Sequence, residues 1–357
     1  MSEARPRITA HRATRRIAWA IFLALLTLTL AVAGATSWWM ASLRPIDVRV
    51  ANIETFEVQP GWGASRVAEE LASQGLIRDD LAFSLWVRIQ GLDRSIGEGL
   101  YDLSPSQSSR EIAALLAAGG RPRTISLTIP EGWRAAQVAA RVSALGFGSE
   151  QDTLALTKDP SSWLPIELPD GASAEGYLLP DTYEIRLDAE PVGVLRRPAE
   201  ALATLLEGGL ASRAETEGLS VHDLVTLASM VQAEAAGPEE MPIIAGVFRN
   251  RLDIGMPLQS DPTVAYGLGK TLPELSRPEG DFEVDHPWNT YTRSGLPFGP
   301  IGNPSKPAYD AVLAPDRLRA DGTPWLYFLH GIEDGQPVFR PNTNLTEHLR
   351  DVNRFLR

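Results

Sequence analysis

The fold is decided by residues 224–269, which read LVTLASMVQAEAAGPEEMPIIAGVFRNRLDIGMPLQSDPTVAYGLG. Apolar residues recur at Leu224, Leu227, Met230 and Val231, the spacing of one face of an α-helix. Glu234 follows at the same spacing near the end of this helix, so it shares the apolar face. A carboxylate that is desolvated and lies near the negative end of a helix dipole is expected to hold its proton, as a general acid must. Glu234 is therefore the candidate catalytic acid.

The residues after Glu234 leave a second interpretation of this acid open. Gly237 and Pro238 are expected to end the first helix and to begin another, EEMPIIAGVFRNRL, because proline is tolerated in a first helical turn. Glu234 then caps its own helix or pairs with Arg249 or Arg251 of the next one. Beyond residue 253 the periodicity is lost, and the sequence becomes rich in the loop-forming residues that often build clefts.

Further segments surround this helical pair. They are WNTYTRSGLPFGPIGNPS at 288–305, WLYFLHG at 325–331 and PVFRPNTNLTEHLRDV at 337–352. Together with residues 224–269 they resemble the MltG (YceG-like) family of membrane-anchored endolytic murein transglycosylases. In that family the helix often carries two acids, the second of which is catalytic; here Gln232 holds the first position and Glu234 the second. Phe298 stands where the family usually has proline, a change expected to alter a loop rather than the chemistry.

The resemblance also implies a set of residues that bind the substrate. Their polar groups would contact the acetamido and hydroxyl groups of a glycan, and Tyr291 would in addition orient Glu234 or the oxocarbenium centre. Asp261 with the proline that follows is equally a turn signature, and Asn303 lies in a loop that it would otherwise simply fix. The implied set is Gln259, Ser260, Asp261, Thr263, Asn289, Tyr291 and Asn303.

The chemistry that the resemblance implies needs one acid and no cofactor. Glycan strands would be cut between MurNAc and GlcNAc, leaving 1,6-anhydro-MurNAc ends, because the sugar's own C6 hydroxyl replaces water. Action on nascent strands beside peptidoglycan synthases, ending strand elongation, is also implied. Two alternatives remain open. A muramidase-type hydrolase would use Glu234 with Asp261, retaining at about 5 Å between the carboxylates and inverting at about 7–9 Å. A non-catalytic scaffold would bind murein through the repeated module and would use neither carboxylate for chemistry.

Composition excludes several other classes of protein. The 357 residues are 44% hydrophobic, which suits two or three domains with packed cores. Cysteine is absent, so neither disulfides nor thiolate chemistry are possible. A net charge of −12 without a basic run in the folded part argues against nucleic acid as a partner. Five histidines occur without HExxH spacing, which disfavours a metal site, and GxSxG, SxxK and phosphate-loop motifs are missing.

The N-terminus carries a membrane-spanning signal. Residues 17–43 contain no charged side chain and are long enough to form a transmembrane helix. Residues 1–16 form a tail with five arginines against one acid, so the positive-inside rule places the N-terminus in the cytoplasm and the body in the periplasm, anchored to the inner membrane by one pass. The alternative is a cleaved signal peptide, although the apolar run is longer than its usual apolar region. Trp38 and Trp39 are expected at the outer membrane interface.

An internal repeat organises the segment after the anchor. FEVQPGWGASRVAEELASQG and SLTIPEGWRAAQVAARVSALG align at an offset of 71, so that Trp62 matches Trp133. Each copy reads as strand, turn and amphipathic helix. Residues 44–120 are therefore predicted to form a stalk and a small α+β module that resembles LysM, either a glycan-binding element or a spacer. Residues 121–357 are predicted to form a larger α+β YceG-like catalytic domain, with a helix over 191–205.

Overall fold

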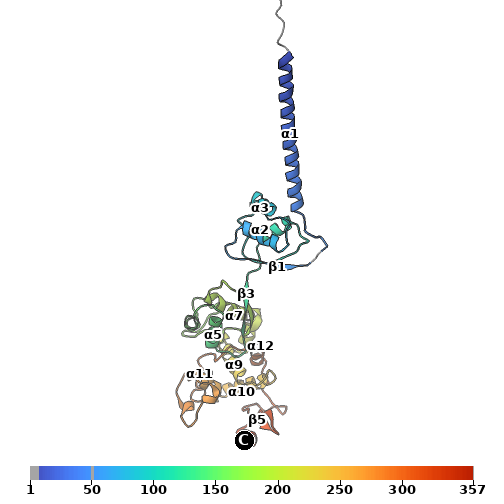
Figure 1. The fold of residues 1–357 in the computed structure, drawn as a ribbon. Coiled ribbons are helices and arrows are strands. Elements are labelled where there is room, and N and C mark those ends of the chain that lie inside the picture. The colour runs from blue at the N-terminus through green and yellow to red at the C-terminus, as the bar shows by residue number, and fades with distance from the viewer. Residues whose placement is uncertain (1–7, 50–51, 357) are drawn as a thin grey trace, which may run out of the picture. The chain divides into compact units, whose positions relative to one another are not determined.

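The computed structural model describes residues 8–49 and 52–356, and these belong to two compact units, 1–123 and 124–357 (Figure 1). Both units mix helices with short antiparallel strand pairs, so the predicted α+β class is confirmed. Each unit has a hydrophobic core of its own, and the second contains two core clusters.

The first unit begins with helix α1, Ile8–Ser42. Its part from Ile17 to Ser42 has a mean hydropathy of 2.3, and every side chain from Ile17 to Trp38 is exposed, so it is long and apolar enough to cross a membrane. The predicted cytoplasmic tail lies partly outside the described residues, which start at Ile8.

The rest of the first unit is a small module built on one strand pair. Strand β1, Glu54–Val58, runs antiparallel to β2, Gly99–Leu103, with Phe56 opposite Tyr101. Helices α2, Ala64–Ser73, and α3, Asp80–Ile89, connect the strands, and α4, Ser109–Ala118, follows them. The core consists of fully buried apolar side chains, among them Phe56, Leu71, Phe83, Leu103 and Ile112. The module therefore has the order strand, helix, helix, strand.

Tryptophans of the first unit pack against this core. Trp62 and Trp86 are half-buried, and the ring of Trp86 lies 6.2 Å from that of Trp39 and 4.6 Å below the guanidinium of Arg110. Trp39 also donates to the carbonyl of Ala82 at 3.4 Å. Trp39 is thus held by α3, which gives it a packing role in addition to the interfacial one that its position predicts.

The second unit starts with the same order of elements. Strand β3, Thr124–Ile129, pairs antiparallel with β4, Asp181–Arg186, and helices α5, Ala135–Ala144, and α6, Glu150–Lys158, stand between them. The repeat seen in the sequence therefore extends beyond one strand and one helix to a whole strand–helix–helix–strand module. Its second copy differs by a longer connection, residues 159–180 against 90–98 in the first copy.

Helices α7 and α8 follow the second module. Helix α7, Pro191–Leu205, has the bounds expected from the sequence; a π-turn, Leu206–Leu210, joins it to α8, Ala211–Thr216.

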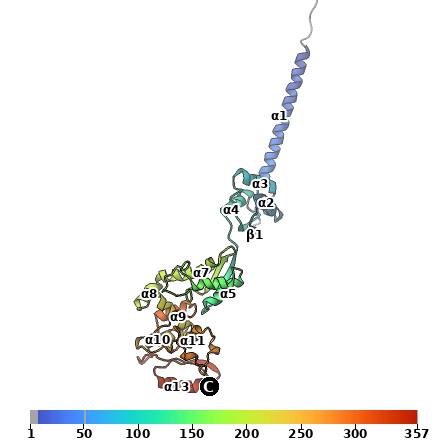
Figure 2. The ribbon, with the colours of Figure 1, turned by 90° about the vertical axis from the view of Figure 1, so that its left-hand side faces the viewer.

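The segment that decides the fold forms the centre of the second unit. Helix α9, Val221–Glu234, is capped by Ser220 and contacts α10, Met241–Asp253, and the shorter α11, Asp261–Gly267 (Figure 2). It also contacts α12, Lys306–Leu313. Every side chain from Leu224 to Val231 is buried. The single apolar stripe inferred from the sequence is therefore too narrow a description, since α9 is covered on all sides.

One local expectation is wrong, and one alternative left open by the sequence does not occur. The second helix begins at Met241 rather than near Pro238, because Pro242 fills its first turn while residues 237–240 form a turn. Asp261 opens α11 rather than a turn; Ser260 is the N-cap and Pro262 lies in the first helical turn, where its missing N–H costs nothing.

The C-terminal part completes the unit. Strands β5, His330–Glu333, and β6, Gln336–Phe339, form a hairpin against α13, Leu345–Phe355. Short 3-10 turns at Leu272–Glu274 and Asp281–Glu283 shape the loop after α11.

Candidate active site

Glu234 is the last residue of α9 and is half-buried. The hydroxyl of Ser260 donates to its Oε1 at 2.5 Å. Among the described residues, Glu234 forms no ion pair with a basic side chain, and its carboxyl group does not cap α9. The carboxyl group is therefore held by a neutral hydroxyl instead of a positive charge.

This environment favours the protonated acid. Burial raises the pKa of Glu234 from its usual 4.5 to about 7, and the negative charge of Asp261 adds to the rise. The hydrogen bond from Ser260 and the charge of Arg251 act in the opposite direction, since both favour the ionised form. Desolvation is the larger effect, so near neutral pH the group is poised to give and to take back a proton.

The arginines that the sequence offered as partners of Glu234 are engaged elsewhere. Arg249 donates to the carbonyl of Glu217 at 2.8 Å and lies 3.7 Å from its carboxylate. Arg251 is buried and donates to the carbonyl of Leu326 at 2.7 Å and to that of Leu258 at 2.8 Å. The salt-bridge interpretation of Glu234 is thus disfavoured.

A network of hydroxyl and backbone groups fixes Ser260. Its N–H donates to Oγ1 of Thr290 at 3.0 Å, and the hydroxyl of Thr263 donates to its carbonyl at 2.6 Å. Thr263 and Thr290 share a further hydrogen bond of 2.9 Å, and the N–H of Gln259 reaches the carbonyl of Thr290 at 3.1 Å. Ser260 and Thr263 are buried, so they hold the carboxyl group of Glu234 from the protein interior.

Gln259 differs from its neighbours in this loop. Its φ of 54° lies in the left-handed region, which costs a residue with a side chain about 1 kcal/mol or more. Its side chain is exposed beside Ser260. The loop thus has an unfavourable backbone conformation at Gln259. The side-chain amide of this residue faces solvent, next to the serine that binds Glu234.

The carboxylate of Asp261, the residue after Ser260, is more exposed and has partners of its own. Tyr291 donates a short hydrogen bond to Oδ1 of Asp261, and Arg277 donates to the Tyr291 hydroxyl at 3.3 Å. Arg277 also lies 4.0 Å from Asp261 and 3.9 Å above the ring of Phe282. Burial and the neighbouring Asp261 raise the pKa of Tyr291, so its phenol stays protonated. Tyr291 therefore orients Asp261 directly; sequence reasoning missed Arg277, which no pattern marked.

The two predicted asparagines are almost fully buried. The amide of Asn289 donates to the carbonyls of Phe282 and Val284 at 3.0 and 2.8 Å, and its oxygen accepts from the N–H of Tyr291 at 2.8 Å. The amide nitrogen of Asn303 donates to the carbonyl of Trp133 at 2.7 Å. These contacts hold loops in place around the site.

Asn303 and Gln232 fasten the second repeat module to α9. The oxygen of Asn303 accepts from the N–H of Leu178 at 2.9 Å, while its backbone pairs with Gly132 and Trp133 at 2.8 Å. Gln232 accepts from the hydroxyl of Ser305 at 2.6 Å. The strand–helix turn of the module is thereby fixed beside the last turn of the helix that carries the acid.

Glu175 is a second buried carboxyl group that sequence reasoning did not single out. Its Oε1 accepts from the N–H of Ala135 at 2.9 Å, and its Oε2 accepts from the Tyr266 hydroxyl at 3.2 Å. Burial raises its pKa to about 7, although these bonds and the charge of Arg134 partly oppose the rise. Its place in the segment EGYLLPDTY was visible in the sequence, but its partners lie far away along the chain.

Within residues 8–49 and 52–356, no group of three or more histidine, aspartate and glutamate side chains has the arrangement of a metal site.

Comparisons with known proteins fit this arrangement. Residues 56–354 match the YceG-like family. An endolytic murein transglycosylase of Bacillus subtilis is 29% identical over 341 residues, covering 92% of this chain and 91% of that protein. A protein of the same name from Streptococcus pneumoniae is also 29% identical, covering 93% of this chain but 65% of its own length. The 2.6 Å crystal structure of a putative YceG-like protein from Listeria monocytogenes has a TM-score of 0.55 and 28% identity, covering 84% of this chain and 99% of that one.

Proposed function

Because this chain belongs to the YceG-like family, we propose that it is an endolytic murein transglycosylase in which Glu234 alone supplies the acid and base. The observation that carries the assignment is the carboxyl group of Glu234, desolvated at the end of a buried helix and held by a neutral hydroxyl. Few structural roles would keep such a group protonated near neutral pH.

The reaction needs no water. Glu234 donates its proton to the glycosidic oxygen as the bond from that oxygen to C1 of MurNAc breaks. The C6 hydroxyl of the same sugar then attacks C1, and its proton passes to the Glu234 carboxylate. The products are a free GlcNAc hydroxyl and a 1,6-anhydro-MurNAc end, and the acid is restored. Proton transfer of this kind contributes about 10²–10⁴-fold in rate.

The remaining residues divide into two groups by exposure. Gln259, Asp261 and Tyr291 reach the surface of the loops beside the acid and supply the polar contacts to the glycan. Ser260 and Thr263 are buried and orient Glu234, a role that Asn289 and Asn303 share through the loops they hold. This division refines the substrate-binding set implied by the sequence.

Asp261 favours a second candidate, a muramidase-type hydrolase. Its carboxylate is close enough to Glu234 to affect the pKa of that acid, and contacts with Tyr291 and Arg277 hold it in place. A second carboxylate would activate water or attack the sugar directly. The two reactions differ in their products, because only the transglycosylase leaves anhydro ends.

One experiment separates these readings. The purified full-length chain in detergent is incubated with uncrosslinked glycan polymers, and the strand ends are identified by mass spectrometry. Anhydro ends in internal fragments, absent with Glu234→Gln, support the proposal; reducing ends indicate the hydrolase. Cleavage that survives in Glu234→Gln would remove the acid from the mechanism, whereas a wild-type chain that binds the strands without cutting them would leave the scaffold interpretation.

We further propose the placement of the enzyme in the cell. Helix α1 anchors the chain in the inner membrane with the arginine-rich end in the cytoplasm, which leaves residues 44–357 in the periplasm. Residues 44–120 form the LysM-like module and residues 121–357 the catalytic domain. Nascent strands would be met there beside peptidoglycan synthases, where cleavage ends their elongation.

A further inference from the structure

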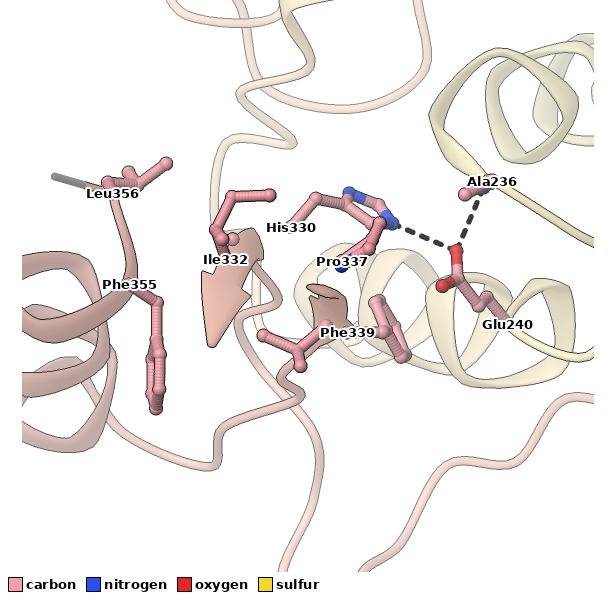
Figure 3. A pocket seen from close by; sticks show the side chains of 10 residues that line it. Ala236, Glu240, His330, Ile332, Pro337, Phe339, Phe355 and Leu356 are labelled. Atoms are coloured by element: carbon pink, nitrogen blue, oxygen red, sulfur yellow. Dashed lines mark hydrogen bonds and ion pairs between the residues drawn. The ribbon is translucent and has the colours of Figure 1, made fainter. Parts of the chain in front are cut away.

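A cavity of about 470 Å³ lies beyond the end of α9, on the side of the β5–β6 hairpin. Figure 3 shows Ile332 and Phe339 between the helix that carries Phe355 and a polar pair formed by His330 and Glu240. The walls are mostly apolar, and Ile332 is 52% exposed at the opening. A concave apolar site with a few convergent polar groups is a typical small-ligand or peptide site.

The polar end of this cavity consists of the carboxyl group of Glu240 and the imidazole of His330. Oε2 of Glu240 accepts from the N–H of Ala236 at 2.8 Å and meets Nε2 of His330 at 2.9 Å (Figure 3). Within the described ranges of the chain, no arginine or lysine forms an ion pair with Glu240. A ligand that presents alkyl groups to the walls and an ammonium group to this end would match the cavity in both respects.

The cavity borders on the proposed catalytic acid through two connections. Ala236 is two residues beyond Glu234, in the turn between α9 and α10. On the other side, the segment that begins at Leu326, bound by Arg251, ends at His330 in the cavity wall. Arg251 is in turn close enough to Glu234 to affect its pKa. The turn after α9 and residues 326–330 therefore connect the surroundings of Glu234 to the wall of the cavity.

The wall of the cavity is closely packed where α13 meets β5. A Cβ atom on Gly331 would lie 2.6 Å from Cβ of Phe355, so glycine is required for α13 to pack this closely on β5. Phe355 is buried by this contact, whereas Leu356 is 58% exposed. The wall is thus preformed, with exposed apolar groups at the rim.

We propose that this cavity binds the peptide stem of the glycan strand that is being cut. The inference rests on the proposed function, in which the sugar that forms the anhydro ring is the one that bears a stem. Stem peptides combine the small methyl groups of alanine with the free amino group of a diamino acid, the chemistry that the apolar walls and Glu240 would recognise. The cavity then makes the enzyme selective for strands that still carry their stems.

The test compares two substrates. The full-length chain is given uncrosslinked strands with intact stems and the same strands stripped by an amidase, and kcat/KM is measured for each. We expect the intact strands to be preferred, and Ile332→Asp to lower that preference about tenfold, because a charge replaces an apolar contact at the opening. Leu318→Asp, a matched change at a residue that is 53% exposed and does not line the cavity, should keep the wild-type ratio. Equal use of both substrates by the wild type, or an unchanged ratio in Ile332→Asp, would overturn the proposal.

A binding measurement separates this proposal from the enzymatic one. A synthetic stem pentapeptide with a free diamino-acid amine is titrated into the full-length Glu234→Gln chain, with and without Glu240→Gln, by calorimetry. Saturable binding that is weaker in the variant with Glu240→Gln supports stem binding in the cavity. This conclusion holds even if the wild type cleaves neither strand preparation. Cleavage of strands without any binding of the pentapeptide retains the function and rejects the cavity.

Discussion

The substitution Glu234→Gln is expected to stabilise the protein while it removes activity. The carboxyl group is desolvated, so its pKa rises from 4.5 to about 7 on folding. Between these values the folded state binds a proton that the unfolded state has released. Stability therefore falls as pH rises through this window, and the neutral amide, which accepts the same hydrogen bond from Ser260, escapes the loss.

The size of the effect follows from the shift. A change of one pKa unit corresponds to 1.36 kcal/mol, so a rise to about 7 corresponds to roughly 3 kcal/mol of unfolding free energy. The variant and the wild type should be about equally stable at pH 4.5. At pH 8 the variant should be more stable by about 3 kcal/mol, because the wild-type carboxylate is then ionised in a desolvated site.

Urea unfolding of the full-length chain in detergent, followed at several pH values, measures this difference. Glu239→Gln, a change of the same kind at an exposed position, serves as the control and should show no such divergence. The contribution of Glu175 is common to both proteins and cancels in the comparison. A difference between variant and wild type that is constant from pH 4.5 to 8 would refute the claim that Glu234 is desolvated.

Three further outcomes are expected. Ser260→Ala removes a hydrogen bond to the ionised form of Glu234, so the alkaline limb of the pH profile of kcat/KM should move upward in pH; a downward shift would contradict this assignment. Tyr291→Phe frees Asp261 and should lower kcat/KM about tenfold or more, measured on uncrosslinked strands, whereas unchanged turnover would make that contact dispensable. Gly246→Ala places a Cβ atom 2.0 Å from the carbonyl oxygen of Asp316, in the loop after α12. We expect the free energy of unfolding in urea to fall by about 1–3 kcal/mol. An unchanged free energy of unfolding would show that the loop moves to accommodate the added methyl group.

Sequence patterns captured the features of this protein that are local. The bounds of α7 agree with the expectation because Pro191 opens a periodic run. The place of Glu234 near the end of α9 agrees with the sequence, because the residue follows the apolar side chains of that helix at helical spacing. The start of α11 at Asp261 was missed, since an Asp-Pro pair serves a turn and a helix N-terminus equally well.

Other features depend on contacts between distant segments. Glu175 is buried by α5 and Tyr266, which lie 40 and 91 positions away along the chain, so no local pattern marks it. The same holds for Arg277, whose partners are Asp261 at the start of α11 and Tyr291 in a later loop. The roles of Asn289 and Asn303 also differ from the simplest expectation, because side chains able to bind a sugar are equally able to hold a loop.

The doubled strand–helix–helix–strand module gives one arrangement two different tolerances to change. The connection between the second helix and the second strand is short in the first copy, residues 90–98, and long in the second copy, residues 159–180, where it carries Glu175. An insertion into the short connection would disturb only the packing of its own module. An insertion into the long connection would displace a buried carboxyl group whose partners lie in other elements, so the first copy should accept added residues far better than the second.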